Sequence, residues 1–308
     1  MTTLVRTPQK APKSEPRSRK VTERQRPLWL LTPGGVLMVV VILIPLAVAL
    51  WISLIDLDQY TLRRWVSAPF IGLANYAEAF DAGLLHSIWI SVSFSVLATA
   101  ATVPIGIAAA LVTQNAYRGR GLVRAVFLIP YVLPSFVVGT VWRTMLQPDG
   151  IVNSLLSSNS LWLNGPRSYW TLVLVEIWAA WPFIYLMSLA GLQAVDHEVH
   201  EASAVDGVTW WPKLTKVILP YLRGPVLLAC LLATLSHINN FTLPFVLFGA
   251  PAPDDVNVMP MLVYVTSFQG LRFGLSAAMA VVSLIIILIP LFGYLRAVRL
   301  DVHEEVRR

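Results

Sequence analysis

Six long apolar stretches, each of membrane-crossing length, constrain this chain more than any other feature of its sequence. A helix rises about 1.5 Å per residue, so roughly 20 apolar residues cover the hydrocarbon core of a bilayer. Lipid offers the backbone no hydrogen-bond partners, and an open chain must therefore cross it as helices. We predict an all-α membrane protein with six transmembrane helices. They are expected at residues 28–54, 87–113, 123–146, 170–192, 222–248 and 273–298.

The first stretch also has features of a secretory signal peptide. Basic residues precede it, and Ala47-Val48-Ala49 resembles a cleavage site. The apolar core of a signal peptide is only about 7–15 residues long. Residues 28–54 form a longer run without any charge, so we interpret them as an uncleaved span. Cys230 is the only cysteine, which excludes an intramolecular disulfide, and we expect it to be a small buried apolar residue.

The distribution of lysine and arginine predicts how the chain is oriented. These residues are frequent in residues 1–26, in the loop after the second stretch, in the loop before the fifth and after the sixth. The other loops hold only a few of them. Because cytoplasmic loops carry the excess of positive charge, both termini and the loop at 193–221 are expected in the cytoplasm. The net charge of +6 is explained in this way without a nucleic-acid partner.

Three regions follow from composition. Residues 1–26 are rich in Pro, Ser, Lys and Arg, so we predict a disordered basic cytoplasmic tail. It would anchor the topology beside the anionic membrane lipid, and a specific lipid-binding role remains the alternative. Residues 27–300 are the predicted transmembrane domain, and residues 301–308 a cytoplasmic C-terminal tail.

The loop at 193–221 is far longer than an ordinary connection between helices. Asp196 can cap a helix, and the acidic Glu198 and Glu201 would then lie near its positive N-terminal end. Gly207 can adopt positive φ and end that helix, and Pro212 suits the start of another. The sequence therefore predicts a short exposed helix, a turn and a second helix. His197 and His200 are three residues apart rather than four, so the zinc pattern of two histidines on one helical face fails.

The same loop closely resembles the EAA loop of importer-type ABC permeases. The resemblance rests on Glu201-Ala202-Ser203-Ala204-Val205-Asp206-Gly207 and, further on, Ile218-Leu219-Pro220. Other segments resemble sugar permeases of the maltose-transporter class, in particular the first of their two permease subunits. These segments are Phe70-Ile71-Gly72-Leu73-Ala74-Asn75-Tyr76, Arg118-Gly119-Arg120-Gly121, Leu128-Ile129-Pro130-Tyr131-Val132-Leu133-Pro134, Trp181-Pro182-Phe183, Asn239-Asn240-Phe241 and Pro244-Phe245-Val246-Leu247. Ser203 departs from the motif's second alanine, and Phe248-Gly249-Ala250-Pro251 replaces the family's glycine-rich turn.

This resemblance implies a fold, partners and a coupling element. The fold is that of type I ABC importer permeases in the bacterial cytoplasmic membrane. The partners are a second homologous permease, two ABC ATPases that bind ATP and Mg, and an extracytoplasmic solute-binding protein. The coupling residues would be Glu201, Ala202, Ser203, Asp206, Gly207, Leu219 and Pro220. Glu201 would pair with a basic residue of the ATPase, although matching the helix dipole alone is the simpler alternative.

The chain itself is not expected to be an enzyme or to bind a cofactor. None of its lysines follows a glycine, so the phosphate-binding loop of ATPases is absent from the sequence. The nucleophile motif Gly-X-Ser-X-Gly is absent as well. Energy for transport is expected from another polypeptide.

Candidate substrate residues lie in the fourth and fifth stretches. By resemblance, Asn239, Asn240 and Phe241 belong to a substrate-lining helix. Glu176 is the only acidic residue within an apolar stretch, and Trp178 is an aromatic ring that could stack on a sugar. For both, packing or contact with water is the alternative, and His237 is expected either to contact substrate or to make an interhelical hydrogen bond.

The predicted function is import of a sugar or related polyol. A permease for an amino acid, phosphate or metal is the rival within the same superfamily, and the uncharged Asn239-Asn240-Phe241 group argues for a neutral polyhydroxyl ligand. A membrane-embedded enzyme or a passive channel is the rival from another class. An enzyme would need several catalytic groups within the stretches, and a channel would not need a long docking loop.

Overall fold

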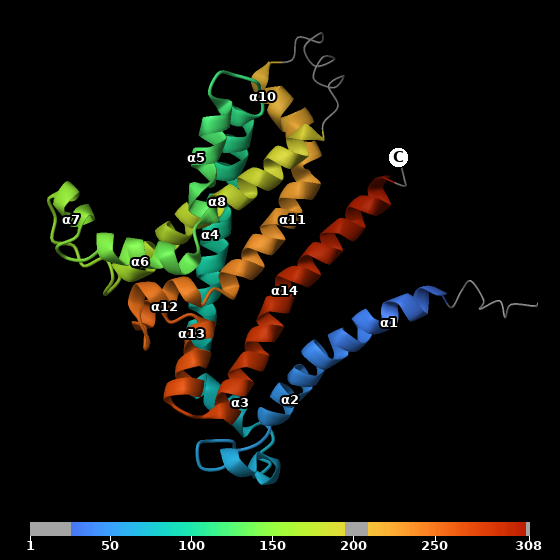
Figure 1. The fold of residues 1–308 in the computed structure, drawn as a ribbon, viewed down its shortest axis with the longest axis vertical. Helices are drawn as coiled ribbons and strands as arrows, with labels where there is room; N and C mark the ends of the chain where they lie inside the picture. The colour runs from blue at the N-terminus through green and yellow to red at the C-terminus, as the bar shows by residue number, and fades with distance from the viewer. Residues whose placement is uncertain (1–25, 195–208, 306–308) are drawn as a thin grey trace, which may run out of the picture. The chain divides into compact units, whose positions relative to one another are not determined.

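A computed structural model of the chain describes residues 26–194 and 209–305, and nearly all of them lie in helices (Figure 1). The chain divides into two compact units, Met1–Ala49 and Leu50–Arg308. The first unit contains α1 (Arg26–Met38), the π-helical η1 (Val39–Leu43) and most of α2 (Ile44–Ile52). From Leu31 to Ile52 this helical stretch is apolar, with its side chains largely uncovered within the chain.

Prolines explain where two helices widen into π turns. A proline cannot donate to the carbonyl four residues before it, and its ring clashes with that carbonyl. The π turn η1 ends two residues before Pro45, and η3 (Leu214–Ile218) ends two residues before Pro220. In η3, the N–H of Leu219 bonds to Leu214 O, one residue further back than in an α-helix. The wider turn lets the helix continue through the proline.

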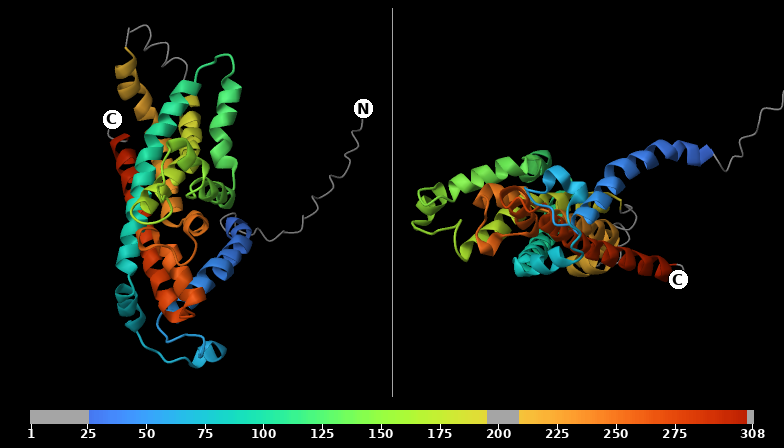
Figure 2. Two further views of the ribbon diagram at one scale, coloured as in Figure 1. Left: turned by 90° about the vertical axis from the view of Figure 1, so that its left-hand side faces the viewer. Right: turned by 90° about the horizontal axis from the view of Figure 1, so that it is seen from below.

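The centre of the second unit is built by α4 (Leu84–Thr113), α8 (Arg167–Gln193) and α11 (Leu219–Ile238), which pack against one another (Figures 1 and 2). One face of α4 is lined by small buried residues three or four positions apart. They are Ser87, Ser91, Ser95, Ala98, Thr102, Gly106 and Ala110. Small residues let helix backbones approach closely, which is the usual basis of helix packing in membranes. A Cβ atom at Gly106 would lie 2.7 Å from Tyr185 N of α8.

The predicted third span, residues 123–146, is two helices rather than one. They are α5 (Arg120–Val132) and α6 (Ser135–Met145), bent by 90° relative to each other (Figure 1). Pro134 disfavours helical backbone at the residue before it, and Leu133 accordingly has an extended ψ of 132°. The chain therefore leaves the helix at Leu133 and starts a new one at Ser135.

The predicted fifth span, residues 222–248, is also interrupted. The helical segment Trp210–Ile238, made of α10 (Trp210–Lys213), η3 and α11, ends earlier than expected. Asn239-Asn240-Phe241 then separate it from α12 (Thr242–Phe248), which packs against α6. The segment Trp210–Ile238 also begins earlier than predicted, so residues 210–221 of the predicted loop at 193–221 are helical.

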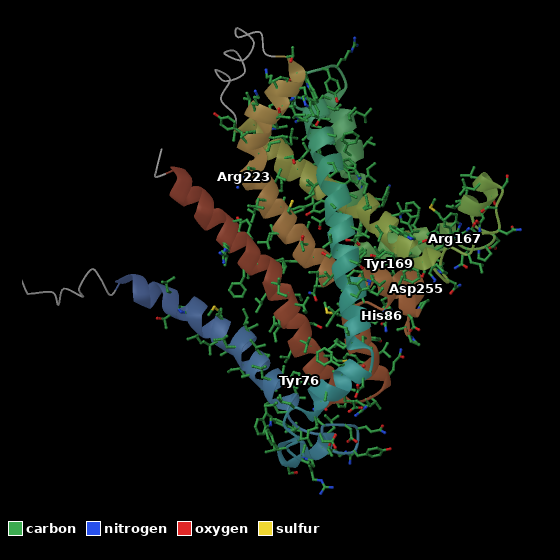
Figure 3. The ribbon with its side chains drawn as sticks, turned by 180° about the vertical axis from the view of Figure 1, so that it is seen from behind. Tyr76, His86, Arg167, Tyr169, Arg223 and Asp255 are labelled. Atoms are coloured by element: carbon green, nitrogen blue, oxygen red, sulfur yellow. The ribbon has the colours of Figure 1, made fainter. Side chains whose placement is uncertain are left out.

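The second unit contains seven further helices within the described residues. They are η2 (Leu62–Ser67), α3 (Ala74–Asp81), α7 (Ile151–Leu156), η4 (Asp254–Val256), α13 (Met259–Tyr264), η5 (Val265–Gln269) and α14 (Phe273–Glu305). Ser91 Oγ accepts a 2.8 Å hydrogen bond from Met259 N, and His86 Nε2 lies 3.2 Å from Asp254 O, beside the labelled Asp255 in Figure 3. These bonds fix α13 and η4 against α4.

One end of the second unit is held together by the segment before α3. The buried Asn75 donates from Nδ2 to Ser53 O and Ile55 O, each at 3.0 Å. Tyr76, labelled in Figure 3, shares a 2.7 Å hydrogen bond with Ser53 Oγ. Arg272 beside α14 makes a two-pronged ion pair with Glu78 of α3. Through α3, the loop that follows α2 and the start of α14 are thus joined at this end.

The all-α membrane fold predicted from the apolar stretches is confirmed. In the described residues, five helices are long and apolar enough to cross a membrane, and the bent pair α5–α6 brings the number to six if it is one span.

Candidate functional site

A cavity of about 560 Å³ lies where the two interrupted spans meet α8. The break at Leu133 forms one side, and the segment from the end of α11 to the start of α12 forms another. Glu176, Ala179 and Ala180 line it from α8. Its polar lining side chains are Tyr131, Ser135, Glu176, Ser236, Asn239, Asn240 and Thr242. Broken helices are tolerated at membrane depth where they line a water-filled cavity, which fits the position of the two breaks.

Asn240 connects the break in the fifth span to α8. Its Nδ2 donates a 2.8 Å hydrogen bond to Glu176 Oε2, and its Oδ1 accepts a 3.2 Å bond from Leu243 N. The second bond satisfies one of the free N–H groups at the start of α12. The two bonds together fix the orientation of the amide, because only the nitrogen can donate and only the oxygen can accept. The sequence prediction of Asn240 as a site residue did not foresee this capping role.

His237 completes a buried polar network behind the cavity. Its Nε2 lies 3.4 Å from Glu176 Oε1, and its Nδ1 lies 3.1 Å from Thr99 Oγ1 of α4. His237 is 2 % exposed and Glu176 6 % exposed. Of the two expectations for His237, the structure therefore shows the interhelical contact. The network ties α4, α8 and α11 together at the level of the break.

The two aromatic candidates have different surroundings. Phe241 lines the cavity, and its ring lies 5.1 Å from Phe245 and 5.0 Å from Tyr264, measured between ring centroids. Trp178 is not among the residues that line the cavity. Its ring packs edge-on against Trp142 of α6, with centroids 5.6 Å apart.

Helix geometry explains why Glu176 and Trp178 separate. Residues two positions apart on an α-helix point in directions about 200° apart, because each residue turns the helix by about 100°. A side chain at 178 must therefore face away from one at 176. The structure also shows a lining residue that the sequence analysis missed, Ser236, which lies in the last turn of α11 just before Asn239 and Asn240. Tyr131 and Ser135 were also missed, because they line the cavity only as a result of the bend.

The predicted coupling residues are only partly described. Glu201, Ala202, Ser203, Asp206 and Gly207 lie outside the described residues. Leu219 and Pro220 lie at the start of α11, inside the continuous helical segment Trp210–Ile238, and both are exposed. These two residues therefore lead directly from the predicted loop to the cavity along one helix.

Comparison with known proteins gives a consistent result. The family described as "Binding-protein-dependent transport system inner membrane component" matches residues 102–300. The chain is 33 % identical over 269 residues to the trehalose transport system permease protein SugA of Mycobacterium tuberculosis, covering 85 % of each chain. It is 27 % identical over 287 residues to the trehalose/maltose transport system permease protein MalF of Thermococcus litoralis, covering 91 % of this chain and 96 % of that protein.

The fold is also shared with a solved structure. A chain of a bacterial ABC transporter involved in the import of the acidic polysaccharide alginate superposes with a TM-score of 0.74. The match covers 89 % of this chain and 96 % of that chain, at 21 % sequence identity. At this identity the match shows a common fold.

Proposed function

This chain belongs to the family of binding-protein-dependent transport system inner membrane components, and we propose that it is the sugar-translocating permease subunit of an ABC importer. The observation that carries the proposal is the cavity at the two helix breaks, lined by Asn239, Asn240 and Phe241. The two relatives that carry trehalose or maltose in their names support a sugar as the solute.

The chemistry of the cavity suits a polyhydroxyl solute. Sugar hydroxyls both donate and accept hydrogen bonds, and an asparagine side chain can do the same. Asn239 is exposed and lines the cavity, so its amide is accessible to a solute. Phe241 adds an aromatic surface, on which the apolar face of a sugar ring can lie. The volume of about 560 Å³ falls in the range of roughly 300–1,000 Å³ that is usual for small-molecule sites.

Energy enters the chain through its partners. In our proposal, two ATPase subunits bind ATP and Mg, a second permease completes the pathway, and an extracytoplasmic binding protein delivers the sugar. Both termini and the loop at 193–221 face the cytoplasm of a bacterium, as the distribution of Lys and Arg favours. Closing of the ATPase pair moves the two coupling loops together and turns the cavity outward, and hydrolysis returns it inward.

Glu201 is the proposed contact with the ATPase, and Ala202 and Ser203 let the partner surface approach. Asp206 and Gly207 shape the turn that presents this helix. From there the movement passes through Leu219 and Pro220 into α11, which ends at the cavity. In the proposal, this continuous helix carries the displacement of the coupling loop to the cavity.

A permease for an amino acid, phosphate or metal is the second candidate within the family. Each of these solutes carries charged groups that require charged or metal-ligating partners. Among the residues lining the cavity, Glu176 is the only acidic or basic side chain, and it is already bonded to Asn240. This composition favours a sugar.

The test is uptake by the complete importer in liposomes, with labelled trehalose and maltose measured beside an amino acid and phosphate. We expect uptake of a sugar only, and a several-fold higher KM for transport with Asn239→Ala. The substitution removes a hydrogen-bonding side chain from the cavity, whereas the backbone N–H of residue 239, which bonds to Leu235 O and His237 O at the end of α11, is kept. Asn164→Ala, at an exposed asparagine outside this cavity, is the matched control and should transport normally. Unchanged uptake in Asn239→Ala and in Asn240→Ala would contradict this placement of the substrate.

A further inference from the structure

The cavity is lined by a single acidic side chain, and its contacts hold it in place. Within the part of the chain that the structure describes, no lysine, arginine or histidine lines the cavity, whereas the carboxyl group of Glu176 does. Arg143 lies on α6, the helix that contributes Ser135 to the cavity, but its guanidinium donates to Val246 O and it lines a separate pocket. The described residues that line the cavity thus offer a solute one acidic group and no cation.

The surroundings of Glu176 suit a carboxylate that accepts hydrogen bonds. Asn240 Nδ2 donates to Oε2, and His237 Nε2 lies 3.4 Å from Oε1, so each oxygen faces a nitrogen. His237 is in turn placed by Thr99, and Asn240 by Leu243 N. Side chains from α4 and α11 and the first turn of α12 therefore hold the carboxyl group at the cavity wall. Glu176 is only 6 % exposed, so it is not a surface charge that serves solubility.

We propose that Glu176, positioned by His237 and Asn240, selects against anionic solutes and makes the cavity specific for neutral sugars and polyols. This inference rests on the proposed function and narrows its substrate class. An anionic sugar, such as a uronate or a sulfonated sugar, would give up its hydration to enter a site where the carboxylate of Glu176 is a like charge. The described residues that line this site include no cationic partner for it. Like charges brought together in a poorly hydrated site repel strongly, and an unpaired buried anion is costly. A neutral sugar can instead donate a hydroxyl to the carboxylate.

The fold alone does not determine whether the solute is neutral or anionic, because an importer of an acidic polysaccharide shares the fold. In our proposal, the side chain at position 176 determines this preference. His237 acts as a positioning residue, since it contacts Glu176 and does not line the cavity. Asn240 both positions Glu176 and remains available at the cavity wall.

The test measures the charge preference of the cavity without using a substrate. Ser236 lines the cavity and is exposed, so a cysteine at this position reports on it. Ser236→Cys is made in a chain carrying Cys230→Ser and assembled with its partners in detergent. The rate of thiol modification is measured with a cationic trimethylammonium-ethyl and an anionic sulfonato-ethyl methanethiosulfonate reagent. The ratio of the two rates, divided by the same ratio for a free thiol, gives the preference for positive charge.

We expect this ratio to favour the cation and to fall by about fivefold or more in Glu176→Gln, because a nearby unit charge acts in opposite directions on the two reagents. Glutamine keeps an oxygen to accept from Asn240, so the site should stay assembled. Glu176→Asp keeps the charge and should keep the preference. A cysteine at Asn164, which lines the separate pocket, should show a ratio that Glu176→Gln does not change.

A ratio that stays within twofold of the unsubstituted value in Glu176→Gln would overturn the inference. A second result would also overturn it: in Ser236→Cys with Glu176 intact, the cationic reagent shows no advantage over the anionic one beyond that seen with a free thiol. The labelling does not depend on transport. Sugar uptake with an unchanged ratio would therefore reject only the charge selection, whereas absence of sugar uptake would reject the proposed function.

Discussion

Gly106 lets α4 and α8 approach closely, and replacing it should loosen the centre of the second unit. A Cβ atom at this position would lie 2.7 Å from both Ile184 Cβ and Tyr185 N. A rotamer change could move Ile184 Cγ2, but Tyr185 N is a backbone atom and Ile184 Cβ is fixed by the backbone of α8, so neither can move unless the helix moves. Carbon atoms pack at about 3.5–4.0 Å, so the two helices would have to separate by roughly an ångström.

The expected cost follows from two opposing effects. Overpacking a tight contact costs about 1–3 kcal/mol of unfolding free energy, whereas replacing glycine in a helix by alanine gains roughly 1 kcal/mol. Gly106→Ala should therefore be nearly neutral to destabilising by about 2 kcal/mol. Gly106→Val adds two more methyl groups than Gly106→Ala and should cost about 2–3 kcal/mol. Separation of the helices should also weaken the 3.0 Å hydrogen bond from Thr113 Oγ1 to Tyr185 Oη.

The assay is thermal unfolding of the purified complex in detergent, followed by the loss of monodisperse protein. Gly293 of α14 is the matched control, because a Cβ atom there would meet nothing within 4 Å. We expect Gly106→Val to lower the unfolding temperature by several degrees and Gly293→Val to leave it nearly unchanged. Equal unfolding temperatures for the two valine variants would refute the argument that α4 and α8 require glycine at their contact.

Three further outcomes are expected. Cysteines placed at Asn159 and at Thr215 should be labelled from opposite sides of the membrane, and labelling from the same side would contradict the proposed orientation. The hydrogen bonds and charge of Arg272 hold the pKa of Glu78 below its usual range, so their pair stabilises the folded chain at neutral pH and this contribution is lost as pH falls through the lowered pKa. Both side chains are nearly half exposed, so Glu78→Gln should lower the unfolding free energy by no more than about 1 kcal/mol at pH 7. Thermal unfolding across pH should show no difference from wild type once the pH is below the pKa of Glu78. Asn75→Ala should lower the unfolding free energy by about 1–3 kcal/mol in urea titrations, since Ser53 O and Ile55 O would lose their shared donor; wild-type stability would contradict that role.

The number of apolar stretches and most helix positions were predictable from the sequence, because the length of an apolar run alone decides whether it can span a bilayer. The two breaks were not predictable in the same way. Pro134 and Pro182 look alike in sequence, yet the chain turns by 90° at Leu133 and continues as one helix, α8, through Pro182. What differs is the tertiary surroundings, since α6 finds α12 to pack against after the bend.

The candidate site was predicted in part for similar reasons. Asn239, Asn240, Phe241 and Glu176 meet at one cavity, which the sequence suggested but could not place. The hydrogen bond between Asn240 and Glu176 joins residues 64 positions apart, and no local pattern indicates such a pair. Trp178 was a poor candidate on helical periodicity alone, because it cannot share a face with Glu176.

As a permease subunit, this chain must pass energy from partner ATPases to a sugar in its cavity. The direct measurement is ATP-dependent uptake of labelled trehalose or maltose by the importer in liposomes, together with ATP hydrolysis with and without the loaded binding protein. The wild-type chain should show both uptake and stimulated hydrolysis. Glu201→Ala should abolish both while the chain still assembles, because loss of one partner of a buried charged contact costs about 2–5 kcal/mol. Normal sugar uptake and normal stimulated hydrolysis in Glu201→Ala would contradict the account.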